Sequence, residues 1–537
     1  MGASTSTATV EDRDSTLLQL GSLSCRLPFG IIYTNQSILG AVANIIAQYC
    51  FTSGTVVLLI LEKKYSGIDN WALLYNDSSV FAGCFFGVLT LGYAGDIFGR
   101  NPALYVATWI LIVGTLCSSL FVWGSPGLTY TLLASFRIVI GIGIGGTWPS
   151  TAAAAFENDE GAGGVYEQRL RNMAWVFGFQ QVGQLLPFVT GLFMLLVFHS
   201  DTDSVQFRLV YLAGALACLV TLHFLKEIGS KIQSEFSRIT SSRSAARSFL
   251  GGLYDSLSGS QTSEESSMML VSSLNYVEMM RRVNKAKKGW ELLGCSLSFF
   301  CAYFYNYGVT IFTVKFMQTI YGGNLDLVHQ YLFYMYSVLA TLPTAWLSVV
   351  LIGRLGTRNL QLLGFALSAL MFGTCGLVFA FDFAASDGSL MVAVLFIRAV
   401  SRFGAPTTVF VLPAVTFDQE SRASTTGVAA SMGFAGSIVS IYATLEVMDK
   451  SYGTWAVFVL YWGVATLGFV TTLVLIPEEK LTSAELEALA LGSRAKYWAT
   501  EAAQGLRASR SAETSPLIHE PEHDTNEEES TELLTST

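Results

Sequence analysis

Long apolar runs recur along the chain, and short polar stretches with Gly, Pro, Asn or charged residues separate them. Each run holds roughly 20 residues, enough for an α-helix to cross about 30 Å of bilayer hydrocarbon. The pattern therefore predicts an all-α polytopic membrane protein with about twelve transmembrane helices in two six-helix halves. The expected spans of the first half are 38–61, 71–94, 102–123, 128–154, 173–198 and 207–226. Those of the second half are 290–320, 328–352, 360–381, 389–416, 423–447 and 453–476.

A segment of about 60 residues between the two halves is rich in Ser and charge, too polar to pack a core. We expect it to be a flexible linker with one amphipathic helix near Tyr276–Lys288. The expected organisation is an N-terminal segment (1–37), a six-helix half (38–226), the linker (227–289), a second six-helix half (290–476) and an acidic tail (477–537).

The distribution of basic residues predicts an orientation. Ten Lys and Arg residues lie between Lys226 and Lys288, whereas the loops expected on the other side carry few, such as Lys63, Lys64 and Lys450. The positive-inside rule then places the linker and both termini in the cytoplasm. The first twenty residues are too polar for a signal peptide, so the first span is expected to direct insertion itself.

Composition excludes several classes of protein. Of the 537 residues, 52% are hydrophobic and 13% are charged, about half of the charge usual in soluble domains. The mean hydropathy is +0.48. A soluble enzyme, a nucleic-acid-binding protein and a disordered scaffold are therefore ruled out. The eight cysteines show no C-x-x-C or metal-site spacing, so no metal or other cofactor is expected. A phosphate-binding loop is also missing from the sequence, which argues against an ATP-driven pump.

The net charge of −9 describes the tail rather than the transmembrane region. Residues 511–537 carry eight acids and no Lys or Arg, which leaves −9 + 8 = −1 for the other residues. The tail also contains Glu513-Thr-Ser-Pro-Leu517-Ile518 and Glu529-Ser-Thr-Glu-Leu533-Leu534. Both resemble acidic dileucine signals bound by vesicle adaptors, and they favour a vacuolar or endosomal membrane, with the plasma membrane as the alternative.

Two related loops suggest that the halves are repeats. Gly95-Asp-Ile-Phe-Gly-Arg-Asn101 follows the second span, and Ile352-Gly-Arg-Leu-Gly-Thr-Arg-Asn359 follows the eighth. Both place glycines and arginines in a tight turn between adjacent helices, as expected for parallel repeats that expose a midplane site alternately. Asp96 and Arg100 of the first loop can hold neighbouring helix ends together on the cytoplasmic side.

Span 128–154 contains Arg137 followed by glycines at 141, 143, 145 and 146. No strand precedes this Gly-rich run, so it is not a dinucleotide-binding fingerprint. Small residues at this spacing instead predict close helix packing. An arginine within an apolar span requires a cavity or a partner, and we expect Arg137 to have one.

Spans 173–198 and 389–416 carry the remaining candidate polar groups. Gln180 and Gln184 share one helix face, where they either join helices or line a polar site. Arg398 and Arg402 are expected one turn apart on the same face of one continuous helix. Each arginine costs about 2.5–3.5 kcal/mol at a bilayer centre, so the pair predicts an anion receptor, or else a brace between the halves.

With the run Phe403–Ala414 and its continuation through Arg422 to Gly433, these motifs resemble the phosphate:proton symporters of the major facilitator superfamily. The resemblance covers most of the chain except the linker and tail. It implies the major facilitator fold and a central phosphate site between the halves. It matches the family's span-5 glutamine at Gln180 and its span-7 tyrosine at Tyr307.

Other positions depart from that family. Its span-4 aspartate–tyrosine pair falls on Thr147 and Trp148, and its span-7 aspartate falls on Tyr303. Its span-7 tryptophan, span-10 asparagine and span-11 lysine fall on Phe299, Pro406 and Phe434. The first span lacks the family's acid, so most carboxylates expected to carry the proton are absent while two arginines are present.

We therefore expect a secondary transporter of an anionic solute, inorganic phosphate first, working by alternating access with protons as candidate co-substrate. The expected substrate-binding residues are Arg398, Arg402, Gln180, Tyr307, Tyr303, Thr147 and Trp148. The expected structural and gating residues are Asp96, Arg100 and Arg137. An organic phosphate, a carboxylate or a sugar stays open as substrate, and so does a non-transporting nutrient sensor.

Overall fold

The computed structural model describes residues 35–65, 70–161, 166–198, 205–225, 288–321, 326–381, 387–449 and 454–477. The N-terminal segment up to residue 34, the amphipathic helix expected near 276–288 and the dileucine patterns of the tail lie outside these residues, except that Lys288 is described. All regular secondary structure of the described ranges is helical, as expected for the predicted fold class.

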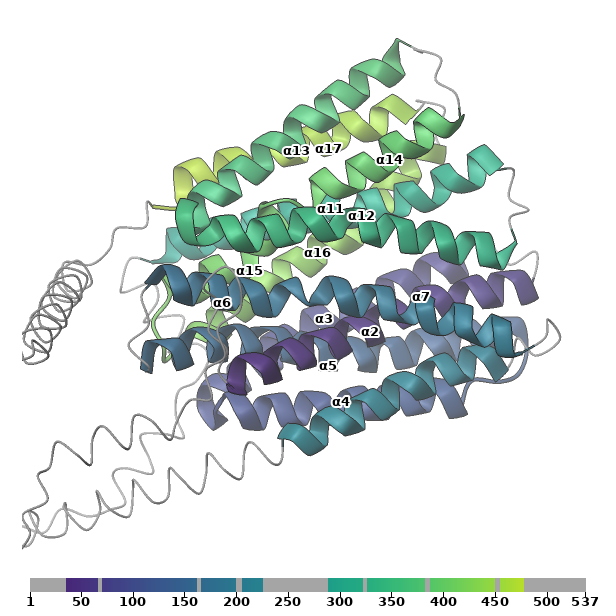
Figure 1. Cartoon of the computed structure of the whole chain (residues 1–537), viewed down its shortest axis with the longest axis horizontal. Helices are drawn as coiled ribbons and strands as arrows, with labels where there is room; N and C mark the ends of the chain where they lie inside the picture. The colour runs from purple at the N-terminus through teal and green to yellow at the C-terminus, as the bar shows by residue number, and fades with distance from the viewer. Residues whose placement is uncertain are drawn as a thin grey trace, which may run out of the picture. The chain divides into compact units, whose positions relative to one another are not determined.

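The helices of the first half are α2 (Asn35–Lys64), α3 (Asn70–Phe98), α4 (Arg100–Leu120), α5 (Pro126–Gly161), α6 (Tyr166–Gly178), α7 (Gln180–Val197) and Val205–Leu225. Those of the second half are α11 (Gly289–Tyr321), α12 (Leu327–Leu355), α13 (Thr357–Ala380), α14 (Asp387–Ser401), α15 (Ala405–Thr416), α16 (Arg422–Asp449) and α17 (Thr454–Leu475). In Figure 1 the purple-to-blue helices of the first half lie on one side and the green-to-yellow helices of the second half on the other.

Eleven helical segments of the described chain are long and apolar enough to cross a membrane, and they match eleven of the expected spans within a few residues. The remaining expected span, 290–320, is α11, which packs against α16 and α17 in the second half. The multi-span architecture expected from the sequence is confirmed.

The glycines of the fourth span let α5 lie directly on α3. A Cβ atom at Gly145 would lie 2.6 Å from the carbonyl oxygen of Cys84 in α3, and one at Gly141 would overlap the carbonyl oxygen of Val80. On the other side of α5, a Cβ at Gly143 would lie 2.7 Å from Leu111 of α4. The prediction of close helix packing at these small residues is therefore confirmed.

One-residue junctions connect α3 to α4 and α12 to α13. Gly99 has a φ of 100° between the first pair, and Gly356 has a φ of 76° between the second. Left-handed backbone of this kind is unstrained only for glycine, so the turn can be this short. The two related loops found in the sequence thus form equivalent junctions in the two halves.

The expected continuous helix over 389–416 is wrong. The helix stops at Ser401 and resumes at Ala405, with Gly404 between them at a φ of 69°. Gly404 lies against α13, where an added Cβ would be 2.8 Å from the Cα of Gly364. The fifth span is also interrupted, at Phe179 between α6 and α7.

Candidate functional site

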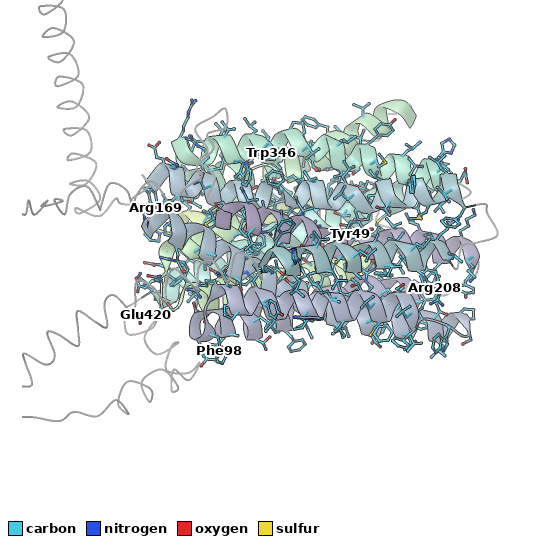
Figure 2. All side chains as sticks on the ribbon, turned by 60° about the horizontal axis from the view of Figure 1, so that its bottom comes forward. Tyr49, Phe98, Arg169, Arg208, Trp346 and Glu420 are labelled. Atoms are coloured by element: carbon cyan, nitrogen blue, oxygen red, sulfur yellow. The ribbon has the colours of Figure 1, made fainter. Side chains whose placement is uncertain are left out.

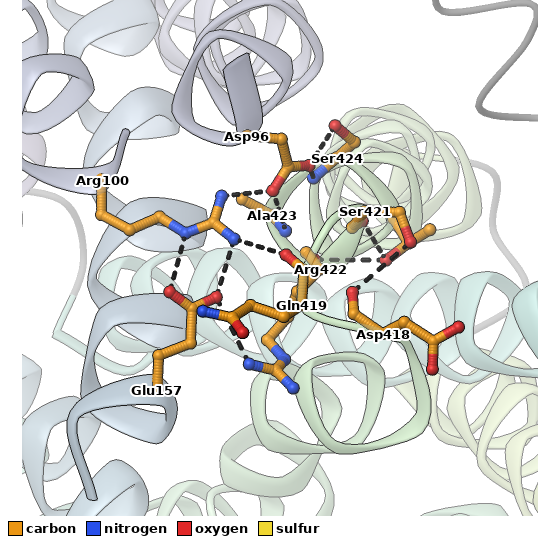
Figure 3. Close-up of polar contacts among 10 residues, drawn as sticks. Asp96, Arg100, Glu157, Asp418, Gln419, Ser421, Arg422, Ala423 and Ser424 are labelled. Atoms are coloured by element: carbon orange, nitrogen blue, oxygen red, sulfur yellow. Dashed lines mark hydrogen bonds and ion pairs between the residues drawn. The ribbon is translucent and has the colours of Figure 1, made fainter. Parts of the chain in front are cut away.

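Asp96 joins the two halves at one end of the bundle. Its carboxylate accepts hydrogen bonds from the backbone N–H of Ala423 at 3.2 Å and of Ser424 at 2.6 Å, and from the Ser424 hydroxyl (Figure 3). These groups form the first turn of α16 in the second half, so Asp96 caps that helix from the first half. Asp96 also pairs with Arg100 of its own half.

Arg100 and Glu157 extend this contact. The Arg100 guanidinium donates to both Glu157 carboxylate oxygens, at 2.7 and 3.2 Å, and to the carbonyl oxygen of Gln419 at 2.9 Å. Arg422 of the second half lies 3.3 Å from the same Glu157 carboxylate. We call Asp96, Arg100, Glu157, Arg422 and Ser424 the interhalf latch. Asp96, Arg100 and Glu157 of the first half all contact the second half, so the latch holds the two halves together at this end.

The latch end is distinct from the opposite end of the bundle. Figure 2 shows Phe98, Arg169 and Glu420 at one end, and Arg208 at the other. Arg208 donates to the carbonyl oxygens of Ser119 at 2.6 Å and Leu120 at 3.3 Å, so it caps the far end of α4. The role expected for Asp96 and Arg100, holding helix ends together, corresponds to contacts that the structure contains.

Between the two ends, aromatic rings of both halves pack against one another. Phe177 of α6 stacks on Phe410 of α15, with centroids 4.6 Å apart, and Trp148 of α5 stacks on Phe434 of α16 at 5.5 Å. Phe81 of α3 meets Tyr307 of α11 edge to face at 4.7 Å. We call the whole set the aromatic layer: Phe51, Phe81, Trp148, Phe177, Phe299, Tyr303, Tyr307, Phe410 and Phe434.

The structure brings several expected substrate-binding residues into this layer. Tyr303 and Tyr307 lie 5.3 Å apart between centroids, and Tyr303 also touches Phe434. Trp148 is 1% exposed, and its Nε1 has no hydrogen-bond partner among the described residues. Thr147 is equally buried but donates to the carbonyl oxygen of Gly143 in its own helix, which leaves no free hydroxyl proton for a ligand.

Arg402 lies at the break between α14 and α15, half-buried at the boundary between the halves. Its Nη2 reaches Oε1 of Gln184 in α7 at 3.5 Å, and its Nε has no hydrogen-bond partner among the described residues. Electrostatic interactions also link Arg402 with Tyr303 and Tyr307. A guanidinium with free donor capacity therefore faces the tyrosines of the aromatic layer.

Arg398 makes its hydrogen bonds within the second half, and it also interacts electrostatically with Arg402 and Tyr307. It is 2% exposed, and it donates from Nε to the Ser337 hydroxyl at 3.1 Å and from Nη1 to the Thr310 hydroxyl at 2.6 Å. Both partners belong to the second half and both are neutral. The last turn of α14 is tightened, since the Arg402 N–H donates to the carbonyl oxygen of Ala399 at 3.3 Å. The two guanidinium groups thus have different hydrogen-bond partners but stay in electrostatic contact.

Gln180 belongs to a polar network within the first half. Its amide donates to Oδ1 of Asn44 in α2 at 3.1 Å, and Asn44 donates to Oγ1 of Thr151 in α5 at 3.0 Å. The next glutamine, Gln181, instead crosses the boundary and accepts from the Thr341 hydroxyl of α12 at 3.0 Å. The two glutamines thus have different roles: Gln180 joins α7 to α2, and Gln184 accepts a hydrogen bond from Arg402.

Arg137 is buried against α2. It is 3% exposed, and a Cβ at Gly54 would overlap its guanidinium. Its Nε and Nη1 have no hydrogen-bond partner among the described residues. Asp77 of α3 interacts with it electrostatically, as does Tyr211. Asp77 and Tyr211 are therefore the groups whose electrostatic interaction with Arg137 the sequence did not reveal.

Comparison with known proteins agrees with this architecture. A family model described as "Sugar (and other) transporter" matches residues 62–488, most of the chain. The chain belongs to this transporter family. The solved structures to which this transporter is similar include the proton:xylose symporter XylE of the major facilitator superfamily bound to 6-bromo-6-deoxy-D-glucose, with a TM-score of 0.63 at 16% identity over 85% of this chain and 98% of that one.

An inward-open structure of XylE from E. coli has a TM-score of 0.55 at 16% identity, over 84% of this chain and 98% of that one. These similarities establish the major facilitator fold expected from the sequence.

Curated relatives of this transporter are named as phosphate transporters. "Inorganic phosphate transporter PT2" of Toxoplasma gondii is 23% identical over 422 residues, which cover 75% of this chain and 65% of that protein. "Probable inorganic phosphate transporter 1-6" of Arabidopsis thaliana is 23% identical over 75% of this chain and 82% of its own length. "Inorganic phosphate transporter PHO84" of Saccharomyces cerevisiae is 25% identical, over 76% and 75%.

Proposed function

We propose that the protein is a secondary transporter that carries inorganic phosphate by alternating access of a site between its two halves. The relatives named as phosphate transporters support this substrate. The observation that carries it is a pair of guanidinium groups, Arg398 and Arg402, with no carboxylate partner among the described residues. Uncompensated positive charge inside a membrane is costly, and a bound oxyanion offsets that cost.

The proposed roles follow from where each side chain lies. Arg402 binds the anion through its free Nε, and Arg398 adds positive charge from the adjoining turn. Tyr303 and Tyr307 orient the anion with their hydroxyls. The Trp148 indole N–H offers one further donor.

Five further expected residues act through the helices. Gln180 holds α7 to α2 through Asn44, and Thr147 shapes the wall of α5. Asp96 and Arg100 close the latch end, and Arg137 acts in gating near the opposite end. The protein in this proposal performs no covalent chemistry on its solute.

Transport assays with purified protein test the proposal. Proteoliposomes containing the wild-type chain should take up radiolabelled phosphate, and an inward proton gradient should increase accumulation. Arg402→Ala should lower the uptake efficiency by about 10- to 150-fold, because each charge-assisted hydrogen bond contributes about 1.5–3 kcal/mol. Arg402→Lys should retain an intermediate rate, since it keeps the charge but loses the planar fork.

Arg354→Ala is the matched control for these variants. Arg354 is an exposed arginine near the end of α12, so its removal changes the net charge without touching the proposed site. If Arg402→Ala transports phosphate as well as wild type at equal protein content, the anion-receptor role of Arg402 is wrong. Binding of phosphate by the wild type without any flux would instead indicate a nutrient sensor.

An organic anion is the second candidate substrate. The aromatic layer favours it, because Trp148, Tyr303 and Phe434 stand where the resembling symporters have carboxylate, hydroxyl or ammonium groups. Rings can pack an apolar group while Arg402 binds its phosphate or carboxylate. Competition of aryl phosphates and aryl carboxylates with phosphate uptake distinguishes the two substrates, and a sugar should not compete.

We also propose that the latch end faces the cytoplasm, together with both termini and the linker, because the basic residues gather in the linker. A vacuolar or endosomal membrane fits the dileucine patterns of the tail, and the plasma membrane is the alternative. Accessibility of terminal tags to protease in intact cells tests the orientation. Fluorescence microscopy with and without Leu533 and Leu534 replaced by Ala tests the role of the tail as an adaptor ligand.

A further inference from the structure

The acidic residues of the described helices lie almost entirely at helix ends. Asp96, Glu157 and Glu446 are near the C-terminal ends of α3, α5 and α16, and Glu167 and Glu291 begin α6 and α11. Asp77 differs, because it lies two turns inside α3, and it is half-buried. A carboxylate at such a place in a membrane protein needs a function or a partner.

Two hydrogen bonds fix the position of Asp77 between the halves. The preceding residue, Asn76, donates to the carbonyl oxygen of Tyr130 in α5 at 3.1 Å. The following residue, Ser78, lies 3.4 Å from the hydroxyl of Tyr442 in α16, so it meets the second half. The backbone of Asp77 is thus held where α3 touches both its own half and the other.

The side chain of Asp77 lies on the interface face of α3. Phe81 is four residues further along and therefore on the same face, one turn closer to the bundle centre. Phe81 contacts Tyr307, one of the proposed substrate-binding residues, at 4.7 Å. Asp77 consequently lies one helical turn from the aromatic layer, on the side away from the latch.

The groups that face Asp77 come from every element around it. Arg137 of α5 attracts its negative charge, and Glu62 of α2 repels it. Tyr334 of α12, in the second half, also interacts with it electrostatically, and Tyr442 of α16 lies beside the neighbouring Ser78. The buried Arg137 has two nitrogens without hydrogen-bond partners among the described residues, and its positive charge attracts Asp77.

We propose that Asp77 is the carboxylate at which phosphate movement is coupled to protons, an inference that rests on the proposed phosphate transport. A proton from the side opposite the latch binds a carboxylate oxygen of Asp77 and forms an O–H bond. The neutral side chain no longer attracts Arg137. The interface between α3, α5 and α12 then carries one negative charge fewer. The O–H bond breaks, and the proton leaves, after the halves have reoriented toward the other side.

This position accounts for a difficulty raised by the sequence. The first span and position 147 lack the carboxylates of the resembling symporters, yet an inward proton gradient needs a group that binds and releases a proton. Asp77 supplies that group from a different helix, and Arg137 supplies its counter-charge. The proton site and the anion site are then separate, with Phe81 and Tyr307 between them.

The test compares two activities of the same proteoliposomes. Counterflow exchange of radiolabelled phosphate needs no net proton movement, whereas accumulation against a gradient does. Asp77→Asn should lower the ratio of gradient-driven accumulation to counterflow by about tenfold or more, while Asp77→Glu should restore it. Asp326→Asn is the matched control, because Asp326 is an exposed carboxylate that makes no side-chain cap on α12, and its ratio should equal that of wild type.

A second measurement requires neither phosphate nor transport activity of the variants. Infrared difference spectra of the wild type between acidic and alkaline pH should contain the C=O stretch of a protonated carboxylic acid. Asp77→Asn should lose that band, Asp77→Glu should shift it, and Asp326→Asn should keep it. Spectra identical in wild type and Asp77→Asn would overturn the proposal.

The outcomes separate the two hypotheses. If the wild type transports phosphate and Asp77→Asn accumulates it normally, the coupling role is wrong and the proposed function stands. If the wild type shows no phosphate transport but the infrared band depends on Asp77, the proposed substrate is wrong and the proton site stands. If both measurements fail, both are overturned.

Discussion

Neutralising Asp96 should open the interhalf latch. Asp96→Asn keeps the shape of the side chain but replaces one carboxylate oxygen with an NH₂ group, which cannot accept a hydrogen bond. Of the three donors that Ala423 and Ser424 direct at this carboxylate, at least one then loses its acceptor. A buried unsatisfied donor costs about 1–3 kcal/mol, and the lost charge at the α16 N-terminus costs about 0.3–1 kcal/mol more.

The sum, about 1.5–4 kcal/mol, corresponds to a shift of about 10- to 1,000-fold in the ratio of open to closed latch. Spin labels at Phe98, which is 72% exposed, and at Leu355, 37% exposed, measure this ratio as a distance distribution across the latch end. The long-distance population should grow in Asp96→Asn. In Asp418→Asn it should stay unchanged, because Asp418 is 78% exposed and pairs with Lys288, which lies next to α11 and not in the first half. Equal distributions in wild type and Asp96→Asn would refute the reasoning.

Two further substitutions test the packing of the bundle and the aromatic layer. Gly145→Val should lower the free energy of unfolding by about 1–3 kcal/mol, since its Cβ would lie 2.6 Å from the Cys84 carbonyl oxygen. Gly127→Ala is the control, because a Cβ at Gly127 meets nothing within 4 Å, and this variant should unfold at the wild-type temperature or above. Trp148→Phe should raise the KM for phosphate, because it removes the indole N–H, which bonds no described residue. The unfolding temperature should not fall, because a phenylalanine ring can still stack on Phe434. An unchanged KM would remove Trp148 from the site.

The spans and the short junctions could be predicted from sequence because local chemistry decides them. Hydrocarbon thickness sets the length of the apolar runs. A turn as short as those at Gly99 and Gly356 requires glycine, and the sequence shows glycine at both places. Asp96 and Arg100 were found for the same reason, since they adjoin such a junction.

The break at Gly404 could not be located, although glycine and Pro406 stand close by. A membrane helix tolerates both residues when neighbours satisfy the freed backbone groups. Here Ser348 of α12 accepts the Gly404 N–H at 2.8 Å, a contact that only the tertiary structure provides. The different hydrogen-bond partners of Arg398 and Arg402 also depend on the tertiary structure and could not be predicted.

Glu157 was missed because it lies close to the end of its span, where a carboxylate is ordinary since it can reach water. Asp77 lies two turns inside α3, but nothing in the sequence pairs it with a group of another helix. Only the packing of α5 against α4 and α16 makes Glu157 the common partner of Arg100 and Arg422. Likewise, only the folded structure places the buried guanidinium of Arg137, which lies against Gly54, where it attracts Asp77.

The aromatic layer has a consequence for leakage. A carrier driven by a proton gradient wastes that gradient if a continuous file of water molecules forms through it, because protons hop along such a file. Trp148 stacked on Phe434, and Phe177 stacked on Phe410, close the boundary between the halves with apolar ring faces. Apolar constrictions of this kind empty of water. The rings therefore separate the two solutions, and under the proposed coupling a proton crosses only with the moving protein.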